Sequence, residues 1–373
     1  MNAASIIPLT AIAIFSLLIL QKKPKTPSDF LLLGINLSLA LIIYSEYAVF
    51  NDGLYGWELF IHFNSIYWMV SLFFSYAYSM VDGKGQLVFK WWFFAFSAPF
   101  FLFSAYDLLI DPSKIPADYE SLFVDPTIIY HLFFKLHKIF FIAVGFHILR
   151  QIRRYNVALK HSHSSLDQIS LHWLRNYTIV LMGFYAIHLV IFLLFNLGFI
   201  PEISEVYLVT GVLLVFAVFY LSYHGIRAYN VSTIYVELPL SNGITKSIKE
   251  KTSNEKLEEN KVIFHQVKSL FEAQQTYTDP NLKIGLLAEQ LNVPSYRLSQ
   301  AINENYGRPF YDFVSNYRTK LLQEKLIAPQ NSNYTIMALA LEVGFNSKAS
   351  LNRIFKEQTG MTPSQFQKSH LTN

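Results

Sequence analysis

Two short stretches near the end of this 373-residue sequence carry side chains that can read DNA bases. Arginine fits the edge of guanine, and asparagine or glutamine fits the edge of adenine, because each pairing forms two parallel hydrogen bonds in the major groove. Two helices are expected to turn such side chains, and smaller ones between them, toward DNA: Tyr296, Arg297, Ser299, Gln300, Lys348, Ala349, Ser350, Asn352, Arg353 and Lys356. Lys356 and Lys368 suit phosphate better than bases, since they lie late in the second stretch or beyond it. The alternative for each residue is a solvated helix face.

An internal repeat explains how two such helices arise. A small residue, three apolar residues and a glycine follow one another at intervals of 5, 5, 4 and 5 in the first copy and 5, 6, 4 and 5 in the second. The positions are Ala288, Val293, Leu298, Ile302 and Gly307, then Ala340, Phe345, Leu351, Phe355 and Gly360. A short helix with a small residue facing its partner, a turn, a second helix and a stopping glycine make a helix-turn-helix unit. The sequence therefore predicts two such units.

The repeat also predicts the bounds of each helix. Supporting helix, turn and reading helix are expected at residues 284–291, 292–294 and 295–306, and again at 335–343, 344–346 and 347–359. One helix over residues 309–327 is expected to join the units, and at ~1.5 Å per residue it is about 28 Å long, close to the ~34 Å of one DNA turn. An amphipathic helix is expected at residues 255–275, and the capping pattern Thr362-Pro363-Ser364-Gln365 starts a last one.

At these residues the sequence closely resembles the DNA-binding domain of the AraC/XylS family of bacterial regulators, over roughly residues 281–368. The most specific part is the second unit, where residues 336–348 read IMALALEVGFNSK, residues 352–356 read NRIFK and residues 360–366 read GMTPSQF. The resemblance implies two reading helices, often assembled as a dimer on repeated half-sites, that control nearby promoters. Duplex DNA, a second copy of the chain and RNA polymerase are therefore implied partners. Two positions depart from the family pattern, Leu351 in place of an aromatic residue and Gln367 in place of an arginine.

The chain is more apolar than a soluble globular protein. The whole chain is 52% hydrophobic, 16% aromatic and only 15% charged, whereas about a quarter of the residues in soluble proteins are charged. Seven apolar stretches are each long enough to cross a ~30 Å hydrocarbon core as a helix, surrounded by lipid. They are residues 1–21, 30–50, 59–81, 87–106, 127–149, 177–200 and 206–223. This front end resembles the membrane-anchored branch of the same family.

The predicted fold class is therefore all-α. Residues 1–224 form a seven-transmembrane helix bundle, residues 225–261 a linker, and residues 262–373 a cytoplasmic AraC-type domain with two helix-turn-helix units joined by a long helix. Loops rich in lysine and arginine stay in the cytoplasm, and they follow the first, third and fifth spans. The chain is thus expected in the bacterial inner (cytoplasmic) membrane as a multi-pass protein, with its N-terminus outside and its DNA-binding tail in the cytoplasm. The first span is interpreted as retained, because its lysines follow the apolar run rather than precede it.

Ionisable residues inside the predicted bundle indicate a second site. His131, Lys135 and Lys138 share one helix face by their spacing, and ionisable groups are costly in a bilayer. We expect an outward-opening polar pocket for a small ligand, with Lys135 and Glu46 as its anchors. The residues expected to sense this ligand are Glu46, His62, His131, Lys135 and His188. Interhelical ion pairs without a ligand are the alternative.

Motifs of enzymes and metal sites are missing from the sequence. It has no cysteine, no phosphate-binding glycine loop, no His-Glu-x-x-His motif and no kinase signature, so no enzymatic activity, cofactor or metal is expected. His161-Ser162-His163 is interpreted as a pair of solvated histidines rather than metal ligands.

Three functions remain open. The leading interpretation is a one-component switch, in which a ligand shifts the bundle and the linker at residues 227–261 repositions the DNA-binding tails. The second is a seven-span receptor or transporter whose tail docks a protein partner. The third is an integral-membrane enzyme that uses His131 and Lys135. Strong salt dependence of binding to duplex DNA would separate the first from the other two.

Overall fold

The computed structural model describes residues 3–23, 25–52, 56–81, 98–110, 128–167, 169–199, 204–228, 253–331 and 333–371. The described residues are helical and contain no strand, which agrees with the expected all-α class. The chain divides into two compact units, Met1–Arg153 with Leu171–Tyr235, and Arg154–Ser170 with Val236–Asn373. The second unit therefore includes a short piece of chain, residues 154–170, that was expected to belong to the bundle.

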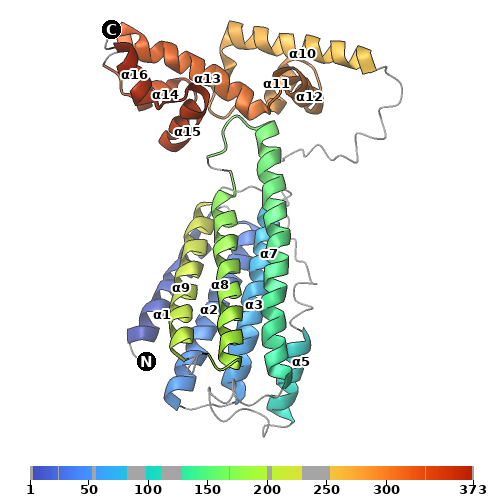
Figure 1. Ribbon diagram of the computed structural model, residues 1–373, viewed down its shortest axis with the longest axis vertical. Helices are drawn as coiled ribbons and strands as arrows, with labels where there is room; N and C mark the ends of the chain where they lie inside the picture. Colours follow the sequence, from blue (N-terminus) through green and yellow to red (C-terminus); the bar gives the residue numbers. More distant parts are fainter. Residues whose placement is uncertain are drawn as a thin grey trace. The chain divides into compact units, whose positions relative to one another are not determined.

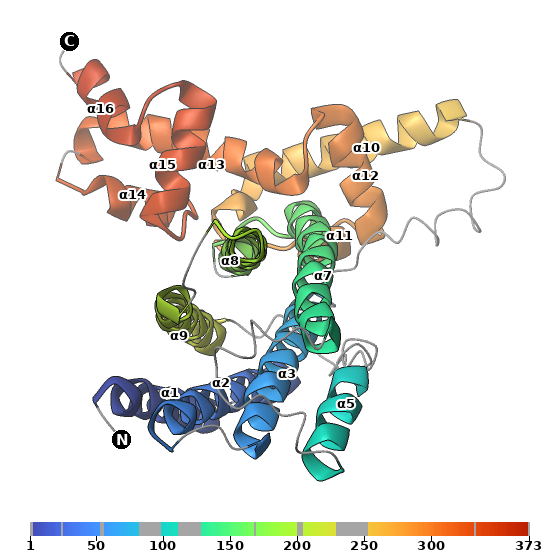
Figure 2. The ribbon, with the colours of Figure 1, turned by 60° about the horizontal axis from the view of Figure 1, so that its bottom comes forward.

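Helices of the first unit run side by side as a bundle (Figures 1 and 2). The described helices are α1 (Ala3–Gln21), α2 (Pro27–Asp52), α3 (Gly56–Val81), α5 (Ala98–Leu109), α7 (Ile128–Ser162), α8 (His172–Asn196) and α9 (Ser204–Arg227). The helix α7 continues past Arg153, so its last turns belong to the second unit.

Each of the seven stretches expected to cross a membrane overlaps one of these helices. Among the described residues, two helical stretches, Pro27–Ser45 and His172–Phe195, are long and apolar enough to cross a bilayer by length and composition alone. Pro8–Gln21 and Val212–Arg227 are apolar but shorter. Residues 87–97 of the fourth expected span lie outside the described residues.

In the first unit many large apolar side chains are exposed and several polar side chains are buried. Large apolar side chains more than 60% exposed include Leu37, Phe146, Val180 and Phe216. The polar side chains Asn36, Asn64, Ser75, Thr178 and Ser222 are almost fully buried. Hydrogen bonds between helices in the described part of this bundle include one of 2.8 Å shared by Ser28 and Ser79, one from Ser222 to Asn36 at 2.9 Å, and one from Asn64 to Ser104 at 3.1 Å. The interior is thus held in part by small polar groups, while the outside is apolar.

Nine short helices build the described part of the second unit beyond residue 253. They are α10 (Ser253–Gln274), η3 (Thr276–Thr278), α11 (Ile284–Gln290), α12 (Ser295–Tyr306), α13 (Phe310–Ile327), η4 (Pro329–Asn331), α14 (Ile336–Glu342), α15 (Lys348–Thr359) and α16 (Pro363–Leu371). The bounds of α12 agree with the expected 295–306, and the other expected helices agree within about two residues. The helix α10 starts inside the stretch expected as a linker.

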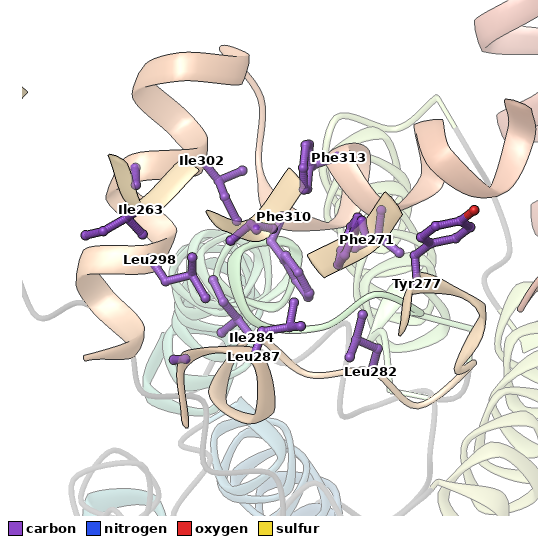
Figure 3. Close-up of a cluster of buried hydrophobic side chains, with 14 residues drawn as sticks. Ile263, Phe271, Tyr277, Leu282, Ile284, Leu287, Leu298, Ile302, Phe310 and Phe313 are labelled. Atoms are coloured by element: carbon purple, nitrogen blue, oxygen red, sulfur yellow. The ribbon is translucent and has the colours of Figure 1, made fainter. Parts of the chain in front are cut away.

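Two hydrophobic cores stabilise this unit, one for each helix-turn-helix. The first gathers side chains from α10 to α13, including Phe271, Leu298 and Phe310 (Figure 3). The second gathers side chains from α13 to α16, including Leu339, Leu351 and Phe355. Full burial of each large apolar side chain contributes about 1.5–3 kcal/mol. Because α13 contributes Phe313 to the first core and Leu322 to the second, it fixes the two helix-turn-helix units to one another.

Candidate nucleic-acid interface

The first predicted reading helix, α12, is held by its buried side. Leu298, Ala301 and Ile302 point into the first core. The helix ends at Gly307, whose φ of +79° is the left-handed conformation that glycine adopts without strain. Tyr296 and Gln300 are exposed, and Ser299 is half-buried. The exposed face therefore carries residues that the sequence predicted to contact DNA.

Contacts with neighbouring residues occupy part of this face. Arg297 is partly buried and forms an ion pair with Glu259 of α10. Gln300 donates a hydrogen bond of 2.7 Å to Glu304. The Arg297 guanidinium must break its ion pair with Glu259 before it can contact a base. This ion pair therefore opposes any contribution of Arg297 to DNA binding.

The second predicted reading helix, α15, presents a wider polar face. Ser347 caps its start, with its Oγ accepting from the Ser350 backbone N–H at 3.1 Å, and Leu351, Ile354 and Phe355 are buried. The exposed residues that the sequence predicted to face DNA are Lys348, Ala349, Asn352, Arg353 and Lys356. Arg353 donates to the Tyr311 hydroxyl at 2.8 Å and keeps an exposed ion pair of 3.5 Å with Glu357. The tyrosine orients the guanidinium without adding an opposing charge.

Ser350 lies differently from its expected place. It was predicted to face a groove, but only 7% of it is exposed, and its Oγ donates to the Asp167 carboxylate at 2.9 Å. The apolar periodicity placed Leu351 inward correctly but could not show that residues from a distant part of the chain cover the adjacent position.

Arg318, which was not predicted from the sequence, and Gly344, which was predicted only as part of the turn 344–346, position the second helix-turn-helix unit. Arg318 of α13 is 2% exposed and donates to the backbone oxygens of Tyr277 (2.7 Å), Ser164 (2.9 Å) and Asp279 (2.8 Å). Gly344 has a φ of +98°, and a Cβ there would lie 2.7 Å from the Thr278 oxygen and 2.8 Å from the Arg318 Nε. The turn before α15 thus packs closely on this buried arginine. Arg318 shares a helix face with the buried Val314 and Leu322, and this was the available sequence signal.

Charge in this region favours a polyanionic partner. Residues 282–373 hold 10 lysines and arginines against 6 acidic residues, and this excess of four accounts for the net charge of +4 of the chain. Such an excess attracts nucleic acid without specifying sequence, which is read by base contacts.

The predicted ligand-sensing residues are only partly described. The side chains of Glu46, His62, His131 and Lys135 lie outside the described residues. His188 is buried, and its ring packs against Phe184 with centroids 4.5 Å apart. The structure also buries two neighbouring ionisable residues of α7, His137 and Lys138. The sequence analysis had noted Lys138 but not His137.

Of the two histidines expected in solvent, His163 is buried and His161 is half-buried. His163 is 7% exposed and its Nδ1 lies 2.8 Å from the Ser162 Oγ, while His161 Nδ1 lies 3.1 Å from the Asn303 Nδ2. Burial lowers the pKa of His163 to about 4, and nearby Lys283 adds to this effect. Among the described residues, no group of three or more histidine or acidic side chains could hold a metal ion.

Comparison with known proteins identifies the C-terminal region. A family model described as a helix-turn-helix domain matches residues 287–369. A solved structure of a protein of unknown function from Listeria innocua is 23% identical, over 29% of this chain and 97% of that chain, with a TM-score of 0.26. A search of curated proteins gives no match. With two capped or glycine-stopped reading helices inside the matched range, residues 287–369 form an AraC-type helix-turn-helix DNA-binding domain, and the chain is a DNA-binding transcription regulator.

Proposed function

We propose that this regulator is embedded in the bacterial inner membrane and that a signal received by its helix bundle controls sequence-specific DNA binding. The observation that carries the proposal is the distribution of side chains in the bundle, where many large apolar residues are exposed while several serines and asparagines, with His137 and His188, are buried. In water each exposed apolar side chain costs about 25 cal/mol per Å². In lipid this cost vanishes, and polar groups are stabilised by hydrogen bonds between helices.

Helix length supports the same proposal. At ~1.5 Å per residue, the 26 residues of α2 and of α3 each span about 39 Å, longer than a ~30 Å hydrocarbon core. Lys22, which follows α1, forms an ion pair of 2.8 Å with Asp29 in the first turn of α2, where the expected topology places the cytoplasmic surface. The full proposal has seven spans, an external N-terminus and a cytoplasmic DNA-binding domain.

The proposed signal is a small ligand or a bilayer component that binds the bundle. Support comes from the buried ionisable residues His137, Lys138 and His188, since such groups in a membrane interior are commonly functional. Lys138 lies over the ring of Phe192, with its Nζ 5.7 Å from the ring centroid. A second copy of the chain binds the second half-site of the operator, and the DNA-bound regulator contacts RNA polymerase at the promoter. No catalytic step is involved.

A two-part experiment tests membrane embedding and DNA binding separately. The full chain is expressed in bacteria, and its resistance to carbonate extraction is measured, with a soluble regulator as the control. The same protein, reconstituted in lipid nanodiscs, is used for genome-wide selection of duplex DNA, beside an Arg353→Ala and Asn352→Ala double variant.

The expected result is retention in the membrane and enrichment of a bipartite site about one helical turn in span, lost in the double variant. Extraction into the soluble fraction would contradict membrane embedding. Failure to bind duplex DNA at low salt would instead favour a receptor or transporter whose tail docks a protein.

A further inference from the structure

A short piece of chain far from the DNA-binding domain in sequence packs against that domain. Residues 154–170 belong to the same compact unit as the helix-turn-helix domain, although more than 80 residues separate them from the start of α10. They comprise the last turns of α7 and the chain that follows it (Figure 1). We refer to residues 161–167 as the docked segment.

Arg318 anchors the middle of the docked segment. Its Nη1 donates to the Ser164 carbonyl at 2.9 Å and its Nη2 donates to the Ser164 Oγ at 3.0 Å. The Ser164 backbone N–H donates to the Leu282 oxygen at 3.1 Å, and Ser164 is 1% exposed. A buried guanidinium needs acceptors for its N–H groups, so the segment satisfies donors that would otherwise require water.

The docked segment contacts both helix-turn-helix units. At its start, His161 bonds to Asn303 of α12. Further on, Asn346 in the turn before α15 donates to the Ser165 Oγ at 3.0 Å. The side chain of Leu166 packs against the second hydrophobic core. One segment therefore connects α12 of the first helix-turn-helix unit with the turn before α15 of the second.

The last residue of the docked segment places a negative charge at the start of α15. The Asp167 carboxylate accepts from the Ser350 Oγ at 2.9 Å, within the first turn of the helix. The N-terminus of a helix carries a partial positive charge that favours anions, and DNA phosphates use the same feature. Asp167 and a phosphate would thus compete for one end of the reading helix, and their charges repel each other.

We propose that residues 161–167 are an intramolecular inhibitor, which ties α12 and α13 to the start of α15, holds Asp167 where a DNA phosphate would bind, and opposes duplex DNA until the segment is withdrawn. This inference rests on the DNA-binding function and names the element that regulates it. Since α7 is one helix from Ile128 to Ser162, a displacement of its proposed membrane portion is passed along the chain directly to the segment. Apart from the packing of Leu166, the segment is held by hydrogen bonds, which water can replace on release.

A reversible cross-link tests the inhibition. The chain contains no cysteine, so Ser165→Cys with Asn346→Cys creates a unique pair that a short, reducible bis-methanethiosulfonate reagent can bridge. The matched control is Lys325→Cys with Glu342→Cys, which joins α13 to α14 at an ion pair of 2.8 Å distant in sequence from the segment. Both proteins are studied as full chains in nanodiscs, with a mixed-sequence 40-base-pair duplex at low salt as the probe.

The expected result is a loss of affinity of about tenfold or more on bridging residues 165 and 346, restored by reductant, with no change for the control pair. Equal or tighter binding by the bridged protein would overturn the inhibition. Absence of duplex binding in the reduced and the unsubstituted proteins alike would overturn the DNA-binding function itself, and this outcome is distinct from the first.

A charge substitution tests the role of Asp167 without a cross-link. Asp167→Asn keeps the shape of the side chain, and Glu272→Gln, an exposed position on α10, removes the same charge elsewhere. Asp167→Asn is expected to bind the duplex at least about threefold more tightly than Glu272→Gln. Equal affinities would show that only net charge matters and would overturn the competition at α15.

Discussion

The two helix-turn-helix units share a plan but differ at equivalent positions. Moving 52 residues along the chain takes Lys283 to Thr335, Asn292 to Gly344 and Val293 to Phe345. Asn292 and Gly344 both have positive φ, +52° and +98°. Asparagine tolerates the left-handed conformation, whereas Gly344 is also in close contact with Thr278 and Arg318. The same turn is thus set by backbone conformation alone in the first unit and by tight packing in the second.

The reading helices differ in how free they are. The ion pair of Arg297 with Glu259 ties α12 to α10, and Asn260 of α10 donates to Glu304 at 2.6 Å. On α15, Lys348, Asn352 and Lys356 are exposed. Arg353 donates to the neutral Tyr311 hydroxyl, and its ion pair with Glu357 is long and exposed, whereas the side chain of Arg297 is only 18% exposed. From this difference we expect α12 mainly to stabilise the domain against α10 and α15 to supply most of the base contacts.

The largest effect is expected from substitutions in the two turns. Gly344→Ala forces an L side chain into the left-handed region and against a backbone oxygen, so it should destabilise the second unit by roughly 3 kcal/mol. Asn292→Ala should cost only about 1 kcal/mol, because a Cβ is already accommodated there. Hydrogen exchange on the full chain in nanodiscs reports the first value in peptides from α14 and α15 and the second in peptides from α11 and α12. Equal costs at the two turns would contradict the packing difference.

Substitution of the two arginines tests which helix reads DNA. Arg353→Ala should weaken binding to the selected site by about 2 kcal/mol, roughly 30-fold, as for loss of a bidentate base contact. Arg297→Ala should weaken it by less than about fivefold, since this arginine must first leave Glu259. Fluorescence anisotropy with labelled duplex measures both affinities. A larger loss for Arg297→Ala would reverse the assignment of roles.

Sequence alone predicted the helices of the DNA-binding region well, because the signals that set these helices are local. Apolar periodicity, the glycine at each helix end and the Thr362 to Gln365 capping pattern all act within a few residues. The burial of Ser350, His163 and Ser164 was not predictable in this way, since it depends on contacts between residues more than 100 positions apart. Segments that dock through single hydrogen bonds leave no periodic pattern in the sequence.

Acidification should weaken the contacts of the docked segment with the first helix-turn-helix unit before its contacts with the second. Burial holds the pKa of His163 near 4, below its usual 6.5, so only the released segment takes up a proton between these pH values. Docking should therefore be unaffected above pH 6.5 and weaken as pH falls toward 4, by about 2 kcal/mol at pH 5. Burial also lowers the pKa of His161, with Asp312 opposing and Lys160 adding to the shift, so it acts in the same direction.

These histidines lie against Asn303 and Lys283 of the first helix-turn-helix unit. Ser165 and Asp167 lie against the second helix-turn-helix unit. Hydrogen exchange at pH 5, corrected for the intrinsic pH dependence of exchange, should rise around residues 281–306 before it rises around residues 345–356. His163→Asn should remove most of the pH dependence. An unchanged profile in this variant would mean that another group governs release.

The smallest expected difference concerns the caps of the supporting helices α11 and α14. The Thr335 Oγ accepts from the Ala338 backbone N–H at 3.1 Å, whereas Lys283, the equivalent N-cap residue of α11, forms no side-chain cap. Thr335→Ala should thus destabilise the second unit by about 1 kcal/mol, and Lys283→Ala should change the first by less than about 0.5 kcal/mol. Both are measured as changes in local opening free energy by hydrogen exchange, in α14 and α11 respectively. Lys283 also helps to keep His163 neutral, so its substitution should raise the pKa of that histidine slightly. Lys283→Ala is therefore a control for the pH profile as well.

A cost at Lys283 as large as that at Thr335 would mean that the first helix-turn-helix unit depends on this lysine for something other than a cap. The backbone bridge between Lys283 and His163 of the docked segment would then account for the cost.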